Sequence, residues 1–125
     1  MILAKNSLER YTSNMNSKIC VIGSSIIDQI AYTQNIPSEG ETLFGDSFQM
    51  GFGGKGANQA VMAGLLGANV YMITCLGDDV YKEMTVTNYQ ANNVNTDHIQ
   101  MVKGSSGVAP IWVDSTGQNR IIVIP

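Results

Sequence analysis

The chain has 125 residues and a formal net charge of −3, with 44% hydrophobic and 14% charged residues. This length is that of one domain, and the apolar share is enough for a folded core, which excludes disorder of most of the chain. The seven Lys and Arg residues are scattered, so no nucleic-acid surface is predicted. No apolar run approaches the roughly 20 residues that cross a membrane.

Residues 1–17 predict a flexible N-terminal tail, because they are mostly polar and show no periodic pattern. Their apolar stretch, residues 1–4, is shorter than the roughly 7–15 apolar residues of a secretory signal, so a cytoplasmic protein is expected. Cys20 and Cys75 lie within apolar runs and have no second Cys or His at the spacing of metal ligands. We therefore expect two buried free thiols in a reducing compartment and no metal site.

From residue 18 onward, short apolar runs alternate with helical patterns. The run at 18–23 is continuous and ends in glycine, which is typical of a strand buried on both faces of a parallel sheet. Turn residues at 37–40 and 114–117 indicate two antiparallel hairpins. The patterns predict, in chain order, strands at 18–23, 30–36 and 42–50, a glycine-rich loop at 51–56, a helix at 57–66, a strand at 70–76, a helix at 81–91, and strands at 94–102, 107–113 and 119–124.

The order of these elements predicts an α/β layered domain, because buried strands alternate with helices. The two hairpins are additional to this pattern and could form a separate small sheet. The sequence ends at Pro125, directly after an apolar strand, where a parallel sheet would keep an edge or a face uncovered. We therefore expect the chain to be the first part of a longer protein.

The strongest local motif is the run Gly-Phe-Gly-Gly-Lys-Gly-Ala-Asn at residues 51–58. A P-loop is disfavoured, because it requires Ser or Thr after the Gly-Lys pair and Gly56 stands there. The glycine spacing matches a dinucleotide-binding fingerprint, although the preceding residues, 45–50, are polar and do not read as a buried strand. A third interpretation is a loop that lets backbone amides at a helix start approach a small polar ligand such as a sugar, with Asn58 beside it. The remaining alternative is that these glycines are needed only for tight packing at the start of the helix and bind no ligand.

Three further positions carry polar groups of interest. Asp28 follows the first strand by a few residues, and ligands of open α/β sheets bind beyond the carboxyl ends of the strands. Its carboxylate could accept two charge-assisted hydrogen bonds from adjacent sugar hydroxyls, and a solvated or turn-capping Asp is the alternative. The adjacent Asp78 and Asp79 are typical of helix caps more than of a metal site. His98 has no nucleophile nearby and is expected to be structural or exposed.

The sequence around the glycine-rich loop closely resembles the ribokinase branch of the PfkB-type sugar kinases. Residues 107–111 and 117–123 resemble the second lid hairpin of that family, so the similarity covers about residues 18–125. The resemblance implies the N-terminal part of a ribokinase-like layered α/β/α domain with a small β-sheet lid, whose strands occupy about 30–50 and 107–124. The positions that match the spaced motif of the family are Gly23, Asp28, Gly53, Gly54, Asn58, Ala60, Gly67 and Gly77.

This resemblance also implies an activity, the ATP-dependent phosphorylation of D-ribose to ribose 5-phosphate by the full-length protein. It implies ATP, Mg²⁺ and a monovalent cation such as K⁺ as cofactors, bound mostly by a C-terminal half that also holds the catalytic base. The 125 residues alone are therefore expected to be inactive, and a homodimer through the lid is expected. The alternatives are a non-catalytic truncated chain that binds sugar or pairs through its lid, and a dinucleotide-binding module.

The resemblance assigns sugar-binding roles to individual residues. Bacterial ribokinases often carry Asn where this chain has Ile26, so the exact sugar preference is open at this position. By motif, the groups that hold sugar hydroxyls are Asp28, Gly54, Lys55 and Asn58, those that shape the loop are Gly53, Gly56 and Ala57, and those that form the apolar side of the lid are Ala109, Ile111 and Val123.

Overall fold

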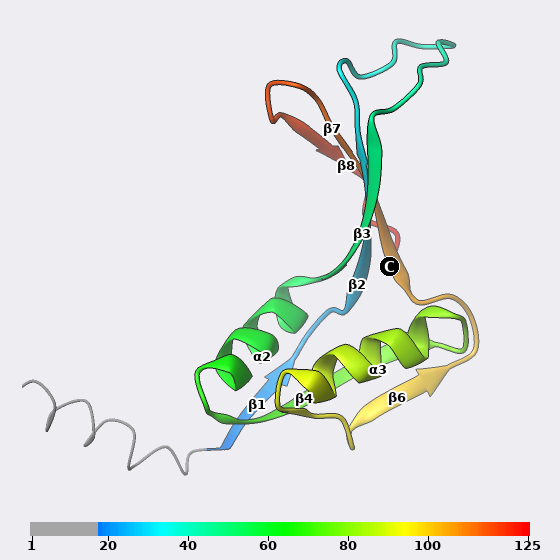
Figure 1. The fold of residues 1–125 in the computed structure, drawn as a ribbon. Helices are drawn as coiled ribbons and strands as arrows, with labels where there is room; N and C mark the ends of the chain where they lie inside the picture. The colour runs from blue at the N-terminus through cyan, green and yellow to red at the C-terminus, as the bar shows by residue number, and fades with distance from the viewer. Residues whose placement is uncertain (1–17) are drawn as a thin grey trace, which may run out of the picture.

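The computed structural model describes residues 18–125, so the predicted tail at 1–17 lies outside the described residues. Two four-stranded sheets are present among these residues: one packs against both helices, and the other projects away from them (Figure 1). We call the first sheet with its helices the body and the second sheet the lid. No helix among the described residues has the length and apolar character needed to cross a membrane.

The body sheet is parallel throughout. β4 (Asn69–Gly77) pairs with β1 (Lys18–Ile22), with β5 (Val94–Asn95) and with β6 (Ile99–Val102). The strands predicted at 18–23 and 70–76 are therefore confirmed. The single strand predicted at 94–102 is wrong, because two short strands replace it: the side-chain oxygen of Asn95 accepts a hydrogen bond from the Asp97 N–H, and this turn interrupts the pairing.

The lid sheet has the strand order β3-β2-β7-β8 and joins the two predicted hairpins. β2 (Ile26–Tyr32) is antiparallel to β3 (Ser47–Gly53) and parallel to β7 (Gly107–Val113), which is antiparallel to β8 (Asn119–Ile121). The predicted separate sheet formed by the two hairpins is thus confirmed. It has four strands, as the body sheet does, and the bounds of its strands differ from the predicted ones.

The first hairpin is displaced from its predicted limits. β2 begins at Ile26 instead of residue 30, and β3 continues to Gly53, into the predicted glycine-rich loop. The reason is that β2 pairs on both of its sides along its whole length, so its partner strand continues through Gly51 and Gly53, where side-chain patterning gives no signal. Asp28 therefore lies inside a strand and not in the connection before one.

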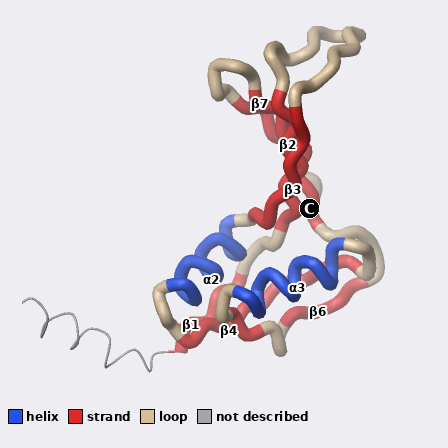
Figure 2. The backbone as a smooth tube through the Cα atoms, in the orientation of Figure 1, coloured by secondary structure: helices blue, strands red, loops and turns tan. Residues whose placement is uncertain are grey.

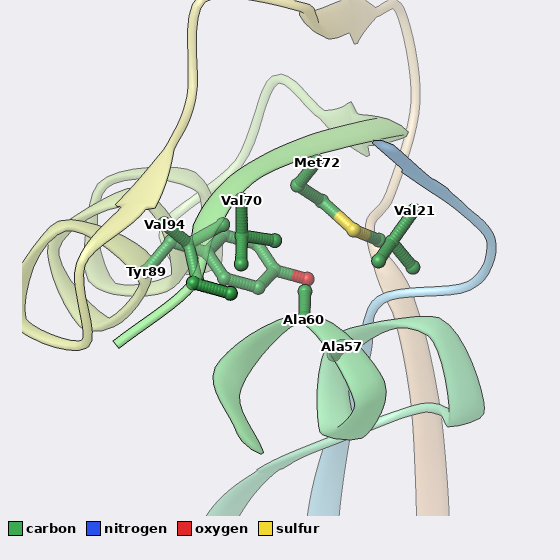
Figure 3. Packing of buried hydrophobic residues seen from close by; sticks show 8 residues of the cluster. Val21, Ala57, Ala60, Val70, Met72, Tyr89 and Val94 are labelled. Carbon is green, nitrogen blue, oxygen red and sulfur yellow. The ribbon is translucent and has the colours of Figure 1, made fainter. Parts of the chain in front are cut away.

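Both helices cover the same face of the body sheet. They are α2 (Lys55–Leu65) and α3 (Tyr81–Ala91), close to the predicted ranges. Their buried side chains form one core with the strands, and Tyr89 at its centre is 1% exposed (Figure 3). The core residues are Val21, Ala57, Ala60, Ala68, Val70, Met72, Tyr89 and Val94.

Neither described helix covers the opposite face of the body sheet, where the side chains of Lys18 and His98 lie near Tyr71. This face carries Cys20, Tyr71 and Ile73, since Cys20 is in register with Tyr71 and alternate residues of a strand share a face. Cys20 and Cys75 are both exposed, so the predicted burial of the two thiols is wrong. Their apolar neighbours in the sequence indicated a strand buried on both faces, but only one of its faces is packed among residues 18–125.

Candidate functional site

The lid and the body meet where two backbones come into close contact. A Cβ atom placed on Gly56 would lie 2.7 Å from both Cα and the carbonyl carbon of Gly23. The N–H of Ala57 donates a hydrogen bond of 3.0 Å to the carbonyl oxygen of Ser24. The first turn of α2 is thereby fixed against the connection between β1 and β2, and this is why the sequence needs glycine at positions 23 and 56.

Gly53 has a different role, which is to leave space for a side chain. It is the partner of Ile26 in the β2–β3 ladder, and a Cβ atom at this position would overlap the carboxylate of Asp28. The carboxylate therefore lies over the backbone of β3 at its last residue. The chain passes from this end of β3 directly into α2 (Figure 2).

A cavity of about 360 Å³ lies between the lid sheet and the start of α2. It brings together most of the residues that the sequence predicts for a sugar site, although they come from positions up to 97 residues apart, Ile26 to Val123. Of the predicted residues, those that line the cavity are Ile26, Asp28, Gly54, Lys55, Ala109, Ile111 and Val123.

Four predicted residues do not line this cavity. Gly53, Gly56 and Ala57 are buried next to it and shape its rim through the contacts described above. Asn58 is exposed in the first turn of α2, where its N–H donates to the Gly54 carbonyl oxygen at 2.9 Å. The structure therefore places Asp28 and Lys55 in the wall of the same cavity and places Asn58 outside that wall.

Three residues line the cavity that the sequence did not indicate: Ser24, Ile121 and Pro125. Ser24 directly follows the glycine that ends the first strand, so its position at the carboxyl end of β1 was a usable signal. Ile121 is in register with Ile111, and only the pairing of β7 with β8 places it on the inner face of the lid.

Two opposite charges face the cavity. Burial raises the pKa of the Asp28 carboxyl above its usual value, since the charged form loses hydration there. Lys55, the first residue of α2, is exposed and also lines the cavity. Asp28 is not part of the single ion pair found among residues 18–125, which joins Lys82 to Asp78 at 2.6 Å. The cavity is therefore lined by a partly desolvated carboxylate and by a cationic side chain.

Asp79 has a structural role at the start of α3. Its Oδ1 accepts a hydrogen bond of 3.0 Å from the Tyr81 N–H, and its Oδ2 accepts one of 2.6 Å from the Ser106 N–H. Burial by itself would raise the pKa of Asp79, but these hydrogen bonds outweigh it and lower the pKa. This is the helix-end role that the sequence predicts. The same carboxylate holds the connection that leads into lid strand β7.

The fold context of the glycine motif excludes the dinucleotide-binding unit. The strand before the motif, β3, is antiparallel to β2 and belongs to the lid, whereas the strand after α2 is β4 of the body. A dinucleotide-binding unit requires two parallel strands of one sheet joined through the helix. The sugar-loop and packing interpretations both remain compatible with this arrangement.

Comparison with known proteins gives the family. The family model described as pfkB family carbohydrate kinase matches residues 16–125. Over 107 residues, which are 85% of this chain, the chain is 47% identical to the deoxyribokinase of Salmonella typhi and 47% identical to the ribokinase of Bacillus subtilis (strain 168). These residues are 35% and 36% of the two relatives, so the chain spans about a third of their length. The solved structure of Arabidopsis thaliana ribokinase complexed with ribose and ATP is 31% identical, with a TM-score of 0.78 over 86% of this chain and 35% of that one. The chain therefore belongs to the pfkB family of carbohydrate kinases.

Proposed function

We propose that this chain forms the sugar-binding part of a cytoplasmic, ATP-dependent pentose kinase. The full-length protein would transfer the γ-phosphoryl group of ATP to the primary hydroxyl of D-ribose, or of the closely related 2-deoxy-D-ribose. The observation that carries this proposal is the cavity that Asp28 and Lys55 line together with apolar residues of the lid strands. Relatives named ribokinase and deoxyribokinase support a pentose as the substrate.

The geometry supports a division of roles among the cavity residues. The Asp28 carboxylate accepts hydrogen bonds from sugar hydroxyls, and such charge-assisted bonds are stronger than neutral ones. Lys55, which lines the same cavity, donates to another hydroxyl. Ala109 and Ile111 of β7 offer an apolar surface to the carbon–hydrogen face of the ring. A pentose would thus be held between polar groups of the body junction and an apolar roof.

ATP as the phosphoryl donor is supported by two solved relatives, ribokinase from Arabidopsis thaliana with ribose and ATP and ribokinase from Cryptococcus neoformans with ADP. Phosphoryl transfer depends mainly on positioning the acceptor hydroxyl and on electrostatic stabilisation of the moving group. Among residues 18–125 no group of three or more His, Cys, Asp or Glu side chains could hold a metal ion, and no Mg²⁺ ligand is assigned to this part. In this proposal the described residues supply the positioning of the sugar.

The face of the lid opposite to Asp28 supports pairing between two copies of the chain as a second element of the proposal. Phe48 and Met50 are alternate residues of β3 on this face, and they are 65% and 44% exposed. Phe52 lies on the same face and lines a cavity together with residues of α3. An apolar strip of this kind on a strand at the edge of a sheet favours association. Sedimentation of a Phe48→Lys variant tests it: dissociation of a dimer supports the pairing, and an unchanged mass contradicts it.

The test of the sugar site uses the protein expressed from the complete reading frame that contains these codons. Asp28→Asn should weaken ribose binding in calorimetry by about tenfold or more, since hydrogen bonds to a charged group contribute roughly 1.5–3 kcal/mol each. Asp78→Asn is the matched control, because its side chain is 69% exposed and it does not line the cavity. Unchanged ribose affinity in Asp28→Asn would contradict the site.

A further inference from the structure

The two central strands of the lid, β2 and β7, each begin directly after a buried serine. Ser25 precedes Ile26 and Ser106 precedes Gly107, and the two serines are 7% and 4% exposed. Ile26 and Gly107 are in register, so both serines lie where the paired strands leave the body. The lid therefore starts from a buried polar junction, in which polar groups need hydrogen-bond partners.

Ser106 makes three hydrogen bonds, all of them to residues 77–79, between the end of β4 and the start of α3. Its N–H donates to Oδ2 of Asp79 at 2.6 Å, and its hydroxyl donates to Oδ1 of the same carboxylate at 2.9 Å. The hydroxyl also accepts a hydrogen bond of 3.1 Å from the Gly77 N–H. A Cβ atom on Gly77 would overlap the Ser106 nitrogen, so the two backbones are in contact as well. These contacts fix the residue from which β7 starts.

The strand that starts at this point contributes to the cavity. Ala109 and Ile111 of β7 line it, and both follow Ser106 within a few residues. Lys55, which lines the same cavity, is the first residue of α2 and belongs to the body. Because the cavity is lined by residues of both parts, the anchoring of the lid at Ser106 determines how these residues stand relative to one another.

Asp79 differs from an ordinary residue at a helix start in the reach of its second oxygen. Its Oδ1 accepts a hydrogen bond from the Tyr81 N–H at 3.0 Å, whereas its Oδ2 bonds to Ser106, which is 27 residues away in the sequence. A serine at position 79 keeps the contact with the Tyr81 N–H, since serine side chains form the same kind of turn. It has a single oxygen, however, and cannot also hold Ser106.

Asp114, at the other end of β7, provides a matched comparison. Its Oδ1 accepts hydrogen bonds from the N–H groups of Thr116 and Gln118 and from the hydroxyl of Thr116. All of these contacts stay within the hairpin of β7 and β8, and Asp114 does not line the cavity. Asp114 therefore orders one end of the same strand without joining it to the body.

We propose that Asp79 is a positioning residue for the sugar: by holding Ser106 it fixes β7 against the body, and it thereby sets the affinity of the cavity for a pentose. The inference rests on the proposed function and adds to it a residue that does not touch the ligand. Asp79 does not line the cavity, so its effect on binding passes through β7 and its residues Ala109 and Ile111.

Calorimetry with D-ribose, on the protein from the complete reading frame, tests the proposal. Asp79→Ser should weaken D-ribose binding by about three- to thirtyfold, the range typical of residues that act on a site through others. Asp114→Ser is the same substitution at the other end of β7 and should leave the dissociation constant unchanged. Ser106→Ala should weaken binding in the same direction as Asp79→Ser, and it leaves the contact between Asp79 and Tyr81 intact. Thermal unfolding of each variant shows that the folded protein is being compared.

A double-variant cycle separates positioning from a general loss of stability. If Asp79 acts through β7, Asp79→Ser should weaken D-ribose binding less in an Ile111→Ala protein, in which β7 has already lost a contact with the sugar. A general loss of stability gives the same fold-change in both backgrounds.

The outcomes distinguish the inference from the function on which it rests. Unchanged D-ribose affinity in Asp79→Ser and Ser106→Ala overturns the role of Asp79. Equal losses in Asp79→Ser and Asp114→Ser, or additive losses in the cycle, overturn the route through β7. If the native protein does not bind D-ribose at all, the proposed function itself is wrong.

Discussion

The hydroxyl of Tyr89 in α3 shares a hydrogen bond with the hydroxyl of Ser25 in the connection between β1 and β2. Both groups are buried, with exposed fractions of 1% and 7%. Burial raises the pKa of Tyr89, and the hydrogen bond from Ser25 counteracts part of that effect. The contact joins the core of the body to the residue that precedes the first lid strand, so α3 helps to fix where the lid leaves the body.

The first prediction is that Ser25 and Tyr89 are energetically coupled. Tyr89→Phe leaves the Ser25 hydroxyl buried without its partner, which should lower the free energy of unfolding by about 1–3 kcal/mol. The double variant Ser25→Ala/Tyr89→Phe should lose less than the sum of the two single variants, because neither hydroxyl is then unpaired. Denaturant unfolding of the four proteins measures this cycle, and additive losses would show that the pair is not coupled.

The second prediction compares two glycines of β3 that face the same side. Gly53→Ala should weaken pentose binding by about ten- to a hundredfold, because the new Cβ atom must displace the Asp28 carboxylate. Gly51→Ala should have little effect, since its Cβ atom would lie 3.8 Å from the Asp28 Cβ atom, an ordinary contact. Calorimetry on both variants checks the difference, and an equal loss in the two would indicate a general effect of alanine on the strand.

The third prediction concerns pH and Asp28. Because burial raises the pKa of Asp28 in the folded chain, the folded state binds more protons than the unfolded state over the interval between the two pKa values. Stability from this group therefore falls as pH rises through that interval. Asp28→Asn should be more stable than the native chain at pH 7, and the difference should shrink as the pH is lowered towards the usual Asp value of 3.8. Chemical unfolding at a series of pH values measures this, and a native chain more stable than the variant at pH 7 would contradict it.

The fourth prediction concerns the 125 residues expressed alone. The open face of the body sheet includes Ile22, which is 77% exposed, so the chain should self-associate in sedimentation experiments. It should show no ATP-dependent ribose phosphorylation above the background without enzyme in a coupled assay. A stable monomer with measurable turnover would contradict both expectations. A soluble inactive dimer would favour pairing through the lid over non-specific association.

The sequence predicted the strands and helices correctly where the local pattern of residues determines the structure. The continuous run at 18–23 predicted β1, the turn residues at 114–117 indicated the hairpin that contains β7, and the helical pattern at 57–66 predicted α2. The prediction from the sequence failed where pairing with a neighbouring strand determines how far a strand extends. Gly51 and Gly53 carry no side-chain pattern, so nothing local shows that β3 continues through them as the partner of β2.

The candidate site divides in the same way. Asp28 and Ile26 could be singled out because they follow the first strand within a recognisable motif. Ile121 reaches the cavity only through its register with Ile111, which is a property of the β7–β8 pairing and not of its own sequence neighbours. The prediction for the two cysteines failed for another reason. An apolar run indicates that a strand can be buried on both faces, but it does not show whether other residues pack on both of those faces.

The contact between Gly23 and Gly56 also limits how this sequence can evolve. A side chain that grows in a protein core is often tolerated after a neighbour becomes smaller. Here the neighbour of each residue is already glycine, which has no side chain that could become smaller. A side chain added at either position therefore cannot be accommodated by a substitution at the other. Descendants that keep this junction keep both glycines, and those that abandon one must rebuild the path of the chain between β1 and β2.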